Sequence, residues 1–266
     1  MTETDNNKKG PVKKRKPRLS RKERERRAVL LSFLAGGTTV GLSLLGYVPI
    51  LRGAELRLRP PGAIDEKEFL ASCIKCGQCV QVCPVEAIKL ADIMDGFGIG
   101  APFLDARMQA CDFSCDAVQC VLACPTGALS HHLDKKEQTR MGFARLDKPD
   151  LCLARHGNGF KGIARGAEFE GLHRYVKVDR WTPIKIADYK YDVPLCDLCV
   201  RECPIKNAIS MEPMSDDPND KRRTPVVHET CVGCGMCEMI CPVEPAAIII
   251  DERKTYKTAQ AEGHKS

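Results

Sequence analysis

The sequence predicts an α+β protein whose short helices and strands are arranged around loops of cysteines. The 266-residue chain has 16 cysteines but only one tryptophan, and every cysteine falls into a set of four. A similar short segment follows the last cysteine of each set, so the chain contains an internal repeat. A long uncharged run near the N-terminus completes the prediction: a repeated cysteine domain behind a signal or anchor helix.

Motif I is the set Cys73, Cys76, Cys79 and Cys83, spaced C-x2-C-x2-C-x3-C and followed directly by Pro84. Thiolates are soft ligands that suit iron–sulfur clusters, and this spacing is the bacterial ferredoxin pattern for a [4Fe–4S] cluster. In two-cluster ferredoxins the fourth cysteine binds the other cluster. The motif therefore predicts a partner motif elsewhere in the chain.

Three further motifs account for the remaining cysteines. Motif IV repeats the spacing of motif I, motif II is less regular, and motif III has one remote member. We assign Cys152 to motif III because 27 residues separate it from motif II, the same interval that separates motifs I and II, and III and IV. Residues 153–195 are then an insertion inside motif III. The members are Cys111, Cys115, Cys120 and Cys124 (motif II), Cys152, Cys196, Cys199 and Cys203 (motif III), and Cys231, Cys234, Cys237 and Cys241 (motif IV).

Each motif ends in Cys-Pro and continues into a similar apolar segment, as in Cys83–Ile88 and Cys241–Ile248. We expect a short turn of helix after the last ligand, because proline suits the first helical position, where an N–H has no partner. A brief strand such as 248–250 should follow. The predicted body, 67–252, is two ferredoxin-like units, each with two [4Fe–4S] clusters.

Two pairings of the motifs are compatible with the sequence. Sequential pairing joins I with II and III with IV, whereas nested pairing joins I with IV and II with III. We favour nesting, because motifs I and IV share a regular spacing and motifs II and III do not. In nested pairing, motifs I and IV exchange their fourth cysteines, so Cys241 joins the first three cysteines of motif I and Cys83 joins the first three of motif IV. Motifs II and III likewise exchange theirs, so Cys203 joins the first three cysteines of motif II and Cys124 joins the first three of motif III. Both pairings use the same sixteen ligands for four clusters.

Other uses of the cysteines fit less well. Disulfide scaffolds are usually much shorter chains, and zinc sites typically use two well-separated C-x2–4-C knuckles. Zinc is strongly disfavoured for motifs I and IV. For motif III, zinc and a three-iron cluster both stay open as alternatives. No Ser/His/Asp set or pair of catalytic carboxylates stands out, so no catalytic residue is predicted.

The N-terminal region is divided sharply by charge. Residues 1–27 carry a net charge of +8, which leaves −2 on the rest of a chain whose total is +6. This local basicity predicts a disordered cytoplasmic tail and no nucleic-acid-binding face. Residues 28–51 contain no charged side chain. As a helix rising ~1.5 Å per residue they would extend roughly 36 Å, enough to cross a membrane, and the Lys/Arg excess would keep the N-terminus in the cytoplasm.

The pair Arg26-Arg27 directly before this run resembles a twin-arginine export signal. Such a route suits a protein whose clusters are assembled in the cytoplasm before export. We therefore expect 28–51 to be a twin-arginine signal or transmembrane anchor, 52–66 a connector and 253–266 a C-terminal tail. The body would then lie on the periplasmic side of the cytoplasmic membrane.

From about Ala28 to Asp251 the sequence resembles the NapG/MauM family of ferredoxin-type electron-transfer proteins. The resemblance rests on the basic leader with paired arginines and on the segments Cys73–Ile88, Leu90–Gly100, Cys120–Leu129 and Cys231–Ile248. Two departures affect motifs II and III. Three residues, in place of two, separate Cys111 from Cys115, and the gap from Cys152 to Cys196 is long.

The resemblance implies an exported protein with four [4Fe–4S] clusters that is not itself an enzyme. It would pass electrons from a quinol-oxidising, polytopic iron–sulfur membrane partner of NapH type to a periplasmic redox partner, in a nitrate-reductase-type or methylamine-utilisation-type system. Residues 28–51 contain no histidine for haem and no charge for quinol protons, so quinol chemistry is expected in the partner. The alternatives are an electron-transfer subunit of another membrane dehydrogenase or hydrogenase-like complex, and a zinc-stabilised scaffold.

Overall fold

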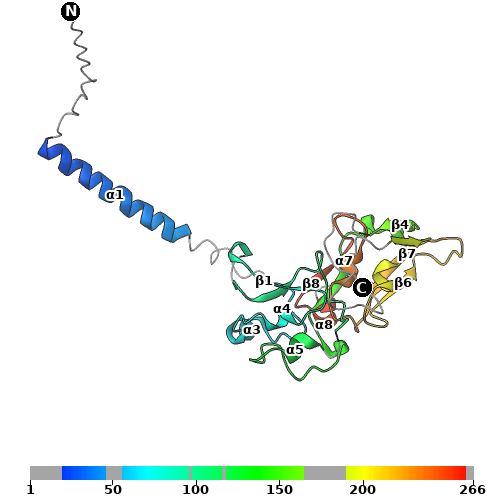
Figure 1. Ribbon diagram of the computed structural model, residues 1–266. Helices are drawn as coiled ribbons and strands as arrows, with labels where there is room; N and C mark the ends of the chain where they lie inside the picture. Colours follow the sequence, from blue (N-terminus) through cyan, green and yellow to red (C-terminus); the bar gives the residue numbers. More distant parts are fainter. Residues whose placement is uncertain (1–19, 46–55, 96–97, 116–117, 165–189, 262–266) are drawn as a thin grey trace, which may run out of the picture. The chain divides into compact units, whose positions relative to one another are not determined.

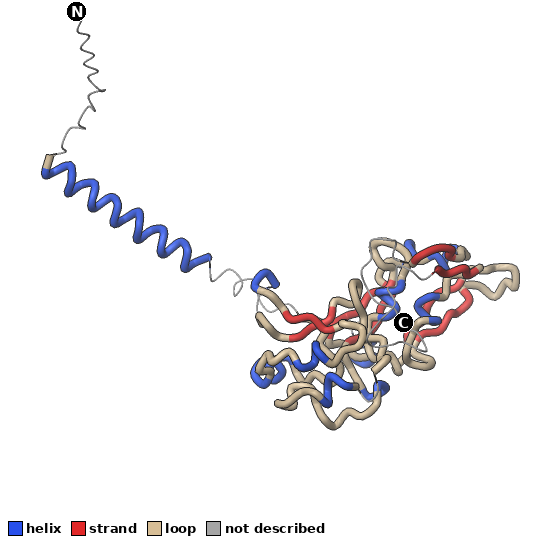
Figure 2. Tube along the Cα trace, viewed as in Figure 1, coloured by secondary structure: helices blue, strands red, loops and turns tan. Residues whose placement is uncertain are grey.

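The computed structural model describes residues 20–45, 56–95, 98–115, 118–164 and 190–261. The chain divides into two compact units, Met1–Leu51 and Arg52–Ser266, which are considered separately below. Figure 1 shows the course of the chain, and Figure 2 shows that loops make up most of the trace of the second unit.

Helix α1 (Arg21–Leu45) is the described element of the first unit. It begins with a capping box, because Ser20 Oγ accepts from the Glu23 N–H at 3.3 Å and the Glu23 carboxylate accepts from the Ser20 N–H at 3.0 Å. The helix thus includes residues 21–27, and the prediction of a disordered tail is wrong for them. Of the expected segment 28–51, residues 46–51 lie outside the described residues.

Within the described ranges, no helix combines the length and the apolar character needed to cross a membrane.

The second unit has mixed helix and strand content, as the sequence predicts. Its described strands form four separate antiparallel pairs rather than one continuous sheet. The pairs are β1 (Ile88–Leu90) with β2 (Pro102–Leu104), β3 (Gly142–Leu146) with β8 (Ile248–Glu252), β4 (Phe160–Ile163) with β5 (Lys190–Val193), and β6 (Ile209–Pro213) with β7 (Arg223–Val227). The helices are α3 (Glu66–Ser72), α4 (Gln78–Gln81), α5 (Gln119–Leu122), α6 (Leu198–Arg201), α7 (Met236–Ile240) and α8 (Tyr256–Ala261).

These elements follow the same order twice. Helices α4 to α7 each carry the third cysteine of one motif; α4 packs against α5, and α6 against α7. The β1–β2 pair lies between motifs I and II, and β6–β7 lies between motifs III and IV. In each half, residues before the first motif pair with residues after the second: Ala63 with Leu129, and β3 with β8. The repeat therefore groups motif I with II and motif III with IV.

The helical turn in each motif lies before the fourth cysteine and not after it. The predicted helix after Cys-Pro is wrong, because a turn or bend follows each fourth cysteine. In motif I, the Ala87 N–H donates to Cys83 Sγ at 3.3 Å instead of to a backbone carbonyl, and Glu86 has φ +53°. Both features prevent the backbone hydrogen bonds of an α-helix from forming at this position. The expected strand at 248–250 is confirmed as part of β8.

Two segments expected at the edges of the body are built into it. Leu58 and Arg59, in the predicted connector 52–66, are 3% and 1% exposed. In the predicted tail 253–266, Arg253 donates to the carbonyls of Ala63 and Ile64, and Tyr256 packs edge-on against Phe143 with ring centroids 5.7 Å apart. The folded unit therefore extends beyond 67–252 at both ends.

Arg59 fixes helix α3 to the body. Its guanidinium donates to the Glu66 carboxylate at 2.6 Å and to the Pro102 carbonyl at 2.8 Å, and it lies 5.0 Å from the centroid of the Phe69 ring. A charge buried this completely is stable only while it is paired.

Replacing Glu66 by Gln should lower the free energy of unfolding by on the order of 2 kcal/mol, because Arg59 would lose its counter-charge inside the protein. Denaturant unfolding followed by circular dichroism measures this. Glu68→Gln, on the exposed side of α3, is the matched control and should change stability little. Equal effects of the two substitutions would contradict the assigned role of the buried pair.

Candidate metal centres

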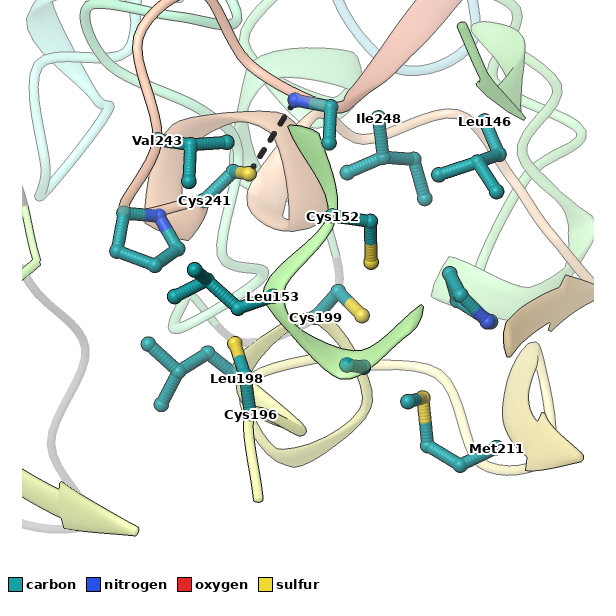
Figure 3. A pocket seen from close by; sticks show the side chains of 14 residues that line it. Leu146, Cys152, Leu153, Cys196, Leu198, Cys199, Met211, Cys241, Val243 and Ile248 are labelled. Carbon is teal, nitrogen blue, oxygen red and sulfur yellow. Dashed lines mark hydrogen bonds between the residues drawn. The ribbon is translucent and has the colours of Figure 1, made fainter. Parts of the chain in front are cut away.

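Two cavities in the second unit are each lined by four cysteines. Set A comprises three cysteines of motif I and the fourth of motif II, around an empty volume of about 360 Å³. Set D comprises three cysteines of motif III and the fourth of motif IV, around about 390 Å³ (Figure 3). The members are Cys73, Cys76, Cys79 and Cys124 for set A, and Cys152, Cys196, Cys199 and Cys241 for set D.

The other eight cysteines fall into two more sets. Within each set, the thiolate of one cysteine raises the pKa of another. Burial raises the pKa of Cys120, and the neighbouring thiolates of Cys115 and Cys83 raise it further. Burial and the thiolates of Cys120, of Cys234 in the other half and of Cys83 act in the same direction on the pKa of Cys111. Set B is accordingly Cys83, Cys111, Cys115 and Cys120.

Set C is assembled in the same way from the second half. Burial raises the pKa of Cys234, and the thiolates of Cys203 and Cys231 add to this. The pKa of Cys237 lies well above its ordinary value because the thiol is buried and because the thiolates of Cys231, Cys234 and Cys203 act on it, together with Cys199 of the neighbouring set D. Set C is therefore Cys203, Cys231, Cys234 and Cys237.

The structure thus groups the predicted cysteines by sequential pairing: two sets line cavities, and the other two follow from the electrostatic effects of neighbouring thiolates. The nested pairing that we favour from the spacing is wrong: Cys241 lies with motif III, not motif I, and Cys83 lies with motif II, not motif IV. The reason is that regular spacing reflects the local turn of one motif. Partner choice is made by the packing of α4 on α5 and of α6 on α7.

Left-handed backbone at the start of three of the short helices turns the cysteines toward a common point. Gly77 and Gly235, each directly after the second cysteine of its motif, precede α4 and α7 with φ +74° and +90°. Glycine adopts this conformation without steric cost. In motif II, Val118 takes the equivalent role with φ +49°, and the longer spacing between Cys115 and Cys120 accommodates it.

The turn after each Cys-Pro supplies an amide donor to the sulfur of the fourth cysteine in three of the motifs. Figure 3 marks the bond in set D. The donors are Ala87 to Cys83 Sγ at 3.3 Å, Leu129 to Cys124 Sγ at 3.5 Å, and Ala247 to Cys241 Sγ at 3.4 Å. Amide donors stabilise a thiolate. Although burial opposes it, the amides of Leu129, Thr126 and Gly127 lower the pKa of Cys124.

The insertion is closed at its base, so Cys152 and Cys196 meet despite their separation in sequence. Strands β4 and β5 pair antiparallel, with Phe160 opposite Val193, and the Cys196 N–H donates to the Asn158 carbonyl at 3.0 Å. At Gly159 a Cβ atom would lie 2.2 Å from the Val193 carbonyl oxygen, so only glycine permits this approach. Residues 165–189 of the insertion lie outside the described residues.

The electrostatics of the sets favour a cationic core bound to thiolates. Burial raises the pKa of Cys79 and of Cys196 to about 11, and neighbouring thiolates contribute. Four crowded, buried thiolates repel one another until a positive centre compensates their charge. Soft sulfur donors around a cavity fit an iron–sulfur cluster. Among the described residues, no group of three or more Cys, His, Asp or Glu that could hold a single metal ion is found.

Sequence reasoning missed Arg107, which holds motif IV in place. Its guanidinium donates to the carbonyls of Glu238 at 2.5 Å, Cys241 at 3.0 Å and Val243 at 2.8 Å. These include carbonyls at the C-terminal end of α7, where a cation is favourable. Arg107 is separated from them by more than a hundred residues, so no local pattern could have identified it.

Comparison with known proteins identifies a family model and several relatives that match this chain. A family model described as a 4Fe-4S dicluster domain matches residues 72–152 and 194–244. The ferredoxin-type protein NapG of Escherichia coli is 36% identical over 219 residues, which cover 80% of this chain and 79% of that protein. The methylamine utilization ferredoxin-type protein MauM of Methylorubrum extorquens is 35% identical over 225 residues, covering 83% and 85%. NapG of Haemophilus influenzae is 33% identical over 256 residues, covering 91% and 76%. No solved structure gives a significant match.

Iron content of paired cysteine variants tests the four sets. Cys83→Ala and Cys120→Ala remove ligands of the same set, so the double variant should lose no more iron and acid-labile sulfide than either single variant. Cys83→Ala combined with Cys237→Ala removes ligands of two sets and should lose the iron of two clusters. Nested pairing would be supported instead if Cys83→Ala with Cys237→Ala lost the iron of one cluster and Cys83→Ala with Cys120→Ala lost the iron of two.

Proposed function

We propose a specific role from one premise: this chain belongs to the NapG/MauM family of ferredoxin-type proteins. It is an iron–sulfur electron-transfer protein, not a catalytic enzyme. In our proposal sets A to D hold four [4Fe–4S] clusters, two in each ferredoxin-like half. A bound cluster supplies reversible one-electron transfer, and the chain relays single electrons between two redox partners.

The cysteines that line two cavities are the observation that carries this proposal. Each cavity draws three sulfurs from one motif and one from its neighbour, as in two-cluster ferredoxins. The grouping of the other eight cysteines into two sets of the same kind supports a total of four clusters. No cysteine is left over for another use. The protein's own contribution is to hold the sulfurs, to aim amide N–H groups at them and to limit their contact with water, which together set the potential.

One end of the body offers a surface for a redox partner. Cys76 of set A is exposed. Large apolar side chains nearby in sequence are exposed too, including Ile74 at 64% and Ile93 at 65%. Leu90 Cδ1 lies 4.0 Å from the position of a Cβ at Gly77, directly after Cys76. Apolar side chains around an accessible sulfur suit a transient protein contact.

We propose further that the chain is exported by the twin-arginine route, with 28–51 as its signal or anchor, and works on the periplasmic side of the cytoplasmic membrane. Its electron donor would be a polytopic, quinol-oxidising iron–sulfur membrane protein of NapH type, and its acceptor a periplasmic redox enzyme. The paired arginines, the uncharged run after them and the methylamine utilization named for one relative support this assignment.

Metal analysis of the anaerobically purified full chain tests the cofactors. Four clusters of four irons predict about sixteen iron atoms and as many acid-labile sulfides per chain, with reduced-cluster signals in EPR. About four zinc atoms without sulfide would instead show a zinc-stabilised scaffold.

Export is tested with Arg26→Lys combined with Arg27→Lys, which keeps the charge but removes the paired arginines. The wild-type body should be degraded by protease added to spheroplasts, whereas the variant should stay protected. Arg21→Lys combined with Arg24→Lys, in the same helix, is the control and should behave as wild type. A wild-type body that resists external protease in intact spheroplasts would refute a periplasmic location.

A further inference from the structure

We propose that the four cysteine sets lie in the spatial order A, B, C, D, so that the two halves join through motifs II and IV. The outer sets then belong to motifs I and III. This order differs from the order of the motifs along the chain. The inference rests on the proposed function and adds to it which sets face each other and which face a partner.

The order within each half follows from the shared cysteines. Motif II supplies Cys124 to set A, and α4 of motif I packs against α5 of motif II, so sets A and B are neighbours. Motif IV likewise supplies Cys241 to set D, and α6 of motif III packs against α7 of motif IV, so sets C and D are neighbours. What remains to be decided is which set of the first half meets which set of the second.

The backbone decides this in favour of sets B and C. The Cys111 N–H donates to the Cys234 carbonyl at 3.1 Å, which joins a ligand of set B directly to a ligand of set C. One residue earlier, the Ala110 N–H lies 3.3 Å from Met239 Sδ.

The chain is tightly packed at this joint. At Gly235, directly after Cys234, a Cβ atom would lie 2.7 Å from the Ala106 Cβ and 3.2 Å from the Ala110 Cβ. At Gly77, the equivalent position of motif I, the nearest atom would be 4.0 Å away. The carbonyls that Arg107 binds at the end of α7 belong to the same joint.

The burial of the cysteines agrees with the proposed order of the sets. Cys111 and Cys120 of set B and Cys231, Cys234 and Cys237 of set C are buried. At one end Cys76 of set A is exposed. At the other, three members of set D are half-buried: Cys152, Cys196 and Cys199. The middle of the series is thus shielded from solvent, and the two ends are where redox partners of this chain would make contact.

Magnetic interaction between reduced clusters tests the order without any assay of electron transfer. Dipolar coupling falls with the cube of the separation, so adjacent clusters broaden each other's EPR signals. A single substitution removes one ligand of one set: Cys76→Ala for set A, Cys115→Ala for set B, Cys231→Ala for set C and Cys196→Ala for set D. Double variants then retain one set from each half, and each preparation is first analysed for iron and sulfide.

The variant that retains sets B and C should show the strongest spin–spin broadening, and the variant that retains A and D should show none. Stronger broadening in any other combination would overturn the order while leaving the iron content, and so the proposed function, intact. Absence of iron and sulfide from the wild-type chain would instead refute the proposed function.

A second measurement serves if a double variant fails to fold. In the otherwise wild-type chain, Gly235→Ala should push the two halves apart and weaken the broadening. Gly77→Ala has the same left-handed backbone but no such contact, and it should leave the broadening between sets B and C unchanged. Equal spectra of the two variants would count against the joint at Cys111 and Cys234.

Discussion

Burial of thiolates, reinforced by repulsion among them, is the constraint on which the second unit of this protein depends. Burial disfavours the ionised form and neighbouring sulfurs add to this effect, as the raised pKa of Cys79 in set A, Cys120 in set B, Cys237 in set C and Cys199 in set D shows. A positive centre removes this penalty, and its binding free energy then contributes to folding. The secondary structure can remain slight for that reason: one-turn helices and two-stranded sheets suffice to carry the ligands.

The polypeptide contributes what the sulfurs alone cannot supply. Amide donors at Ala87, Leu129 and Ala247 stabilise negative charge on the fourth cysteine of three motifs. Buried pairs such as Arg59 with Glu66 fix the loops that flank the sets. These groups act on position and charge rather than on bond making, which agrees with an electron-transfer protein and not an enzyme.

Specific contacts join the two halves. Arg107 reaches the carbonyls of motif IV, and Gly235 has no room for a side chain beside Ala106. The hairpin of β4 and β5 allows an insertion to separate Cys152 from Cys196 in sequence without separating them in space.

The sequence by itself identified the sixteen candidate ligands, because the soft character of a thiolate and the recurring Cys-Pro motifs are local properties. It also determined the α+β character and the strand at 248–250. Only the tertiary structure decided which motifs share sulfurs, that the turn after Cys-Pro is not helical, and that Leu58, Arg59 and Arg253 belong to the body. The pairing and the extent of the body depend on contacts between elements separated in sequence, such as the packing of α4 on α5 and of α6 on α7, and the bond from Arg253 to the Ala63 carbonyl. No local pattern encodes a contact of that range, because it results from the packing of whole elements.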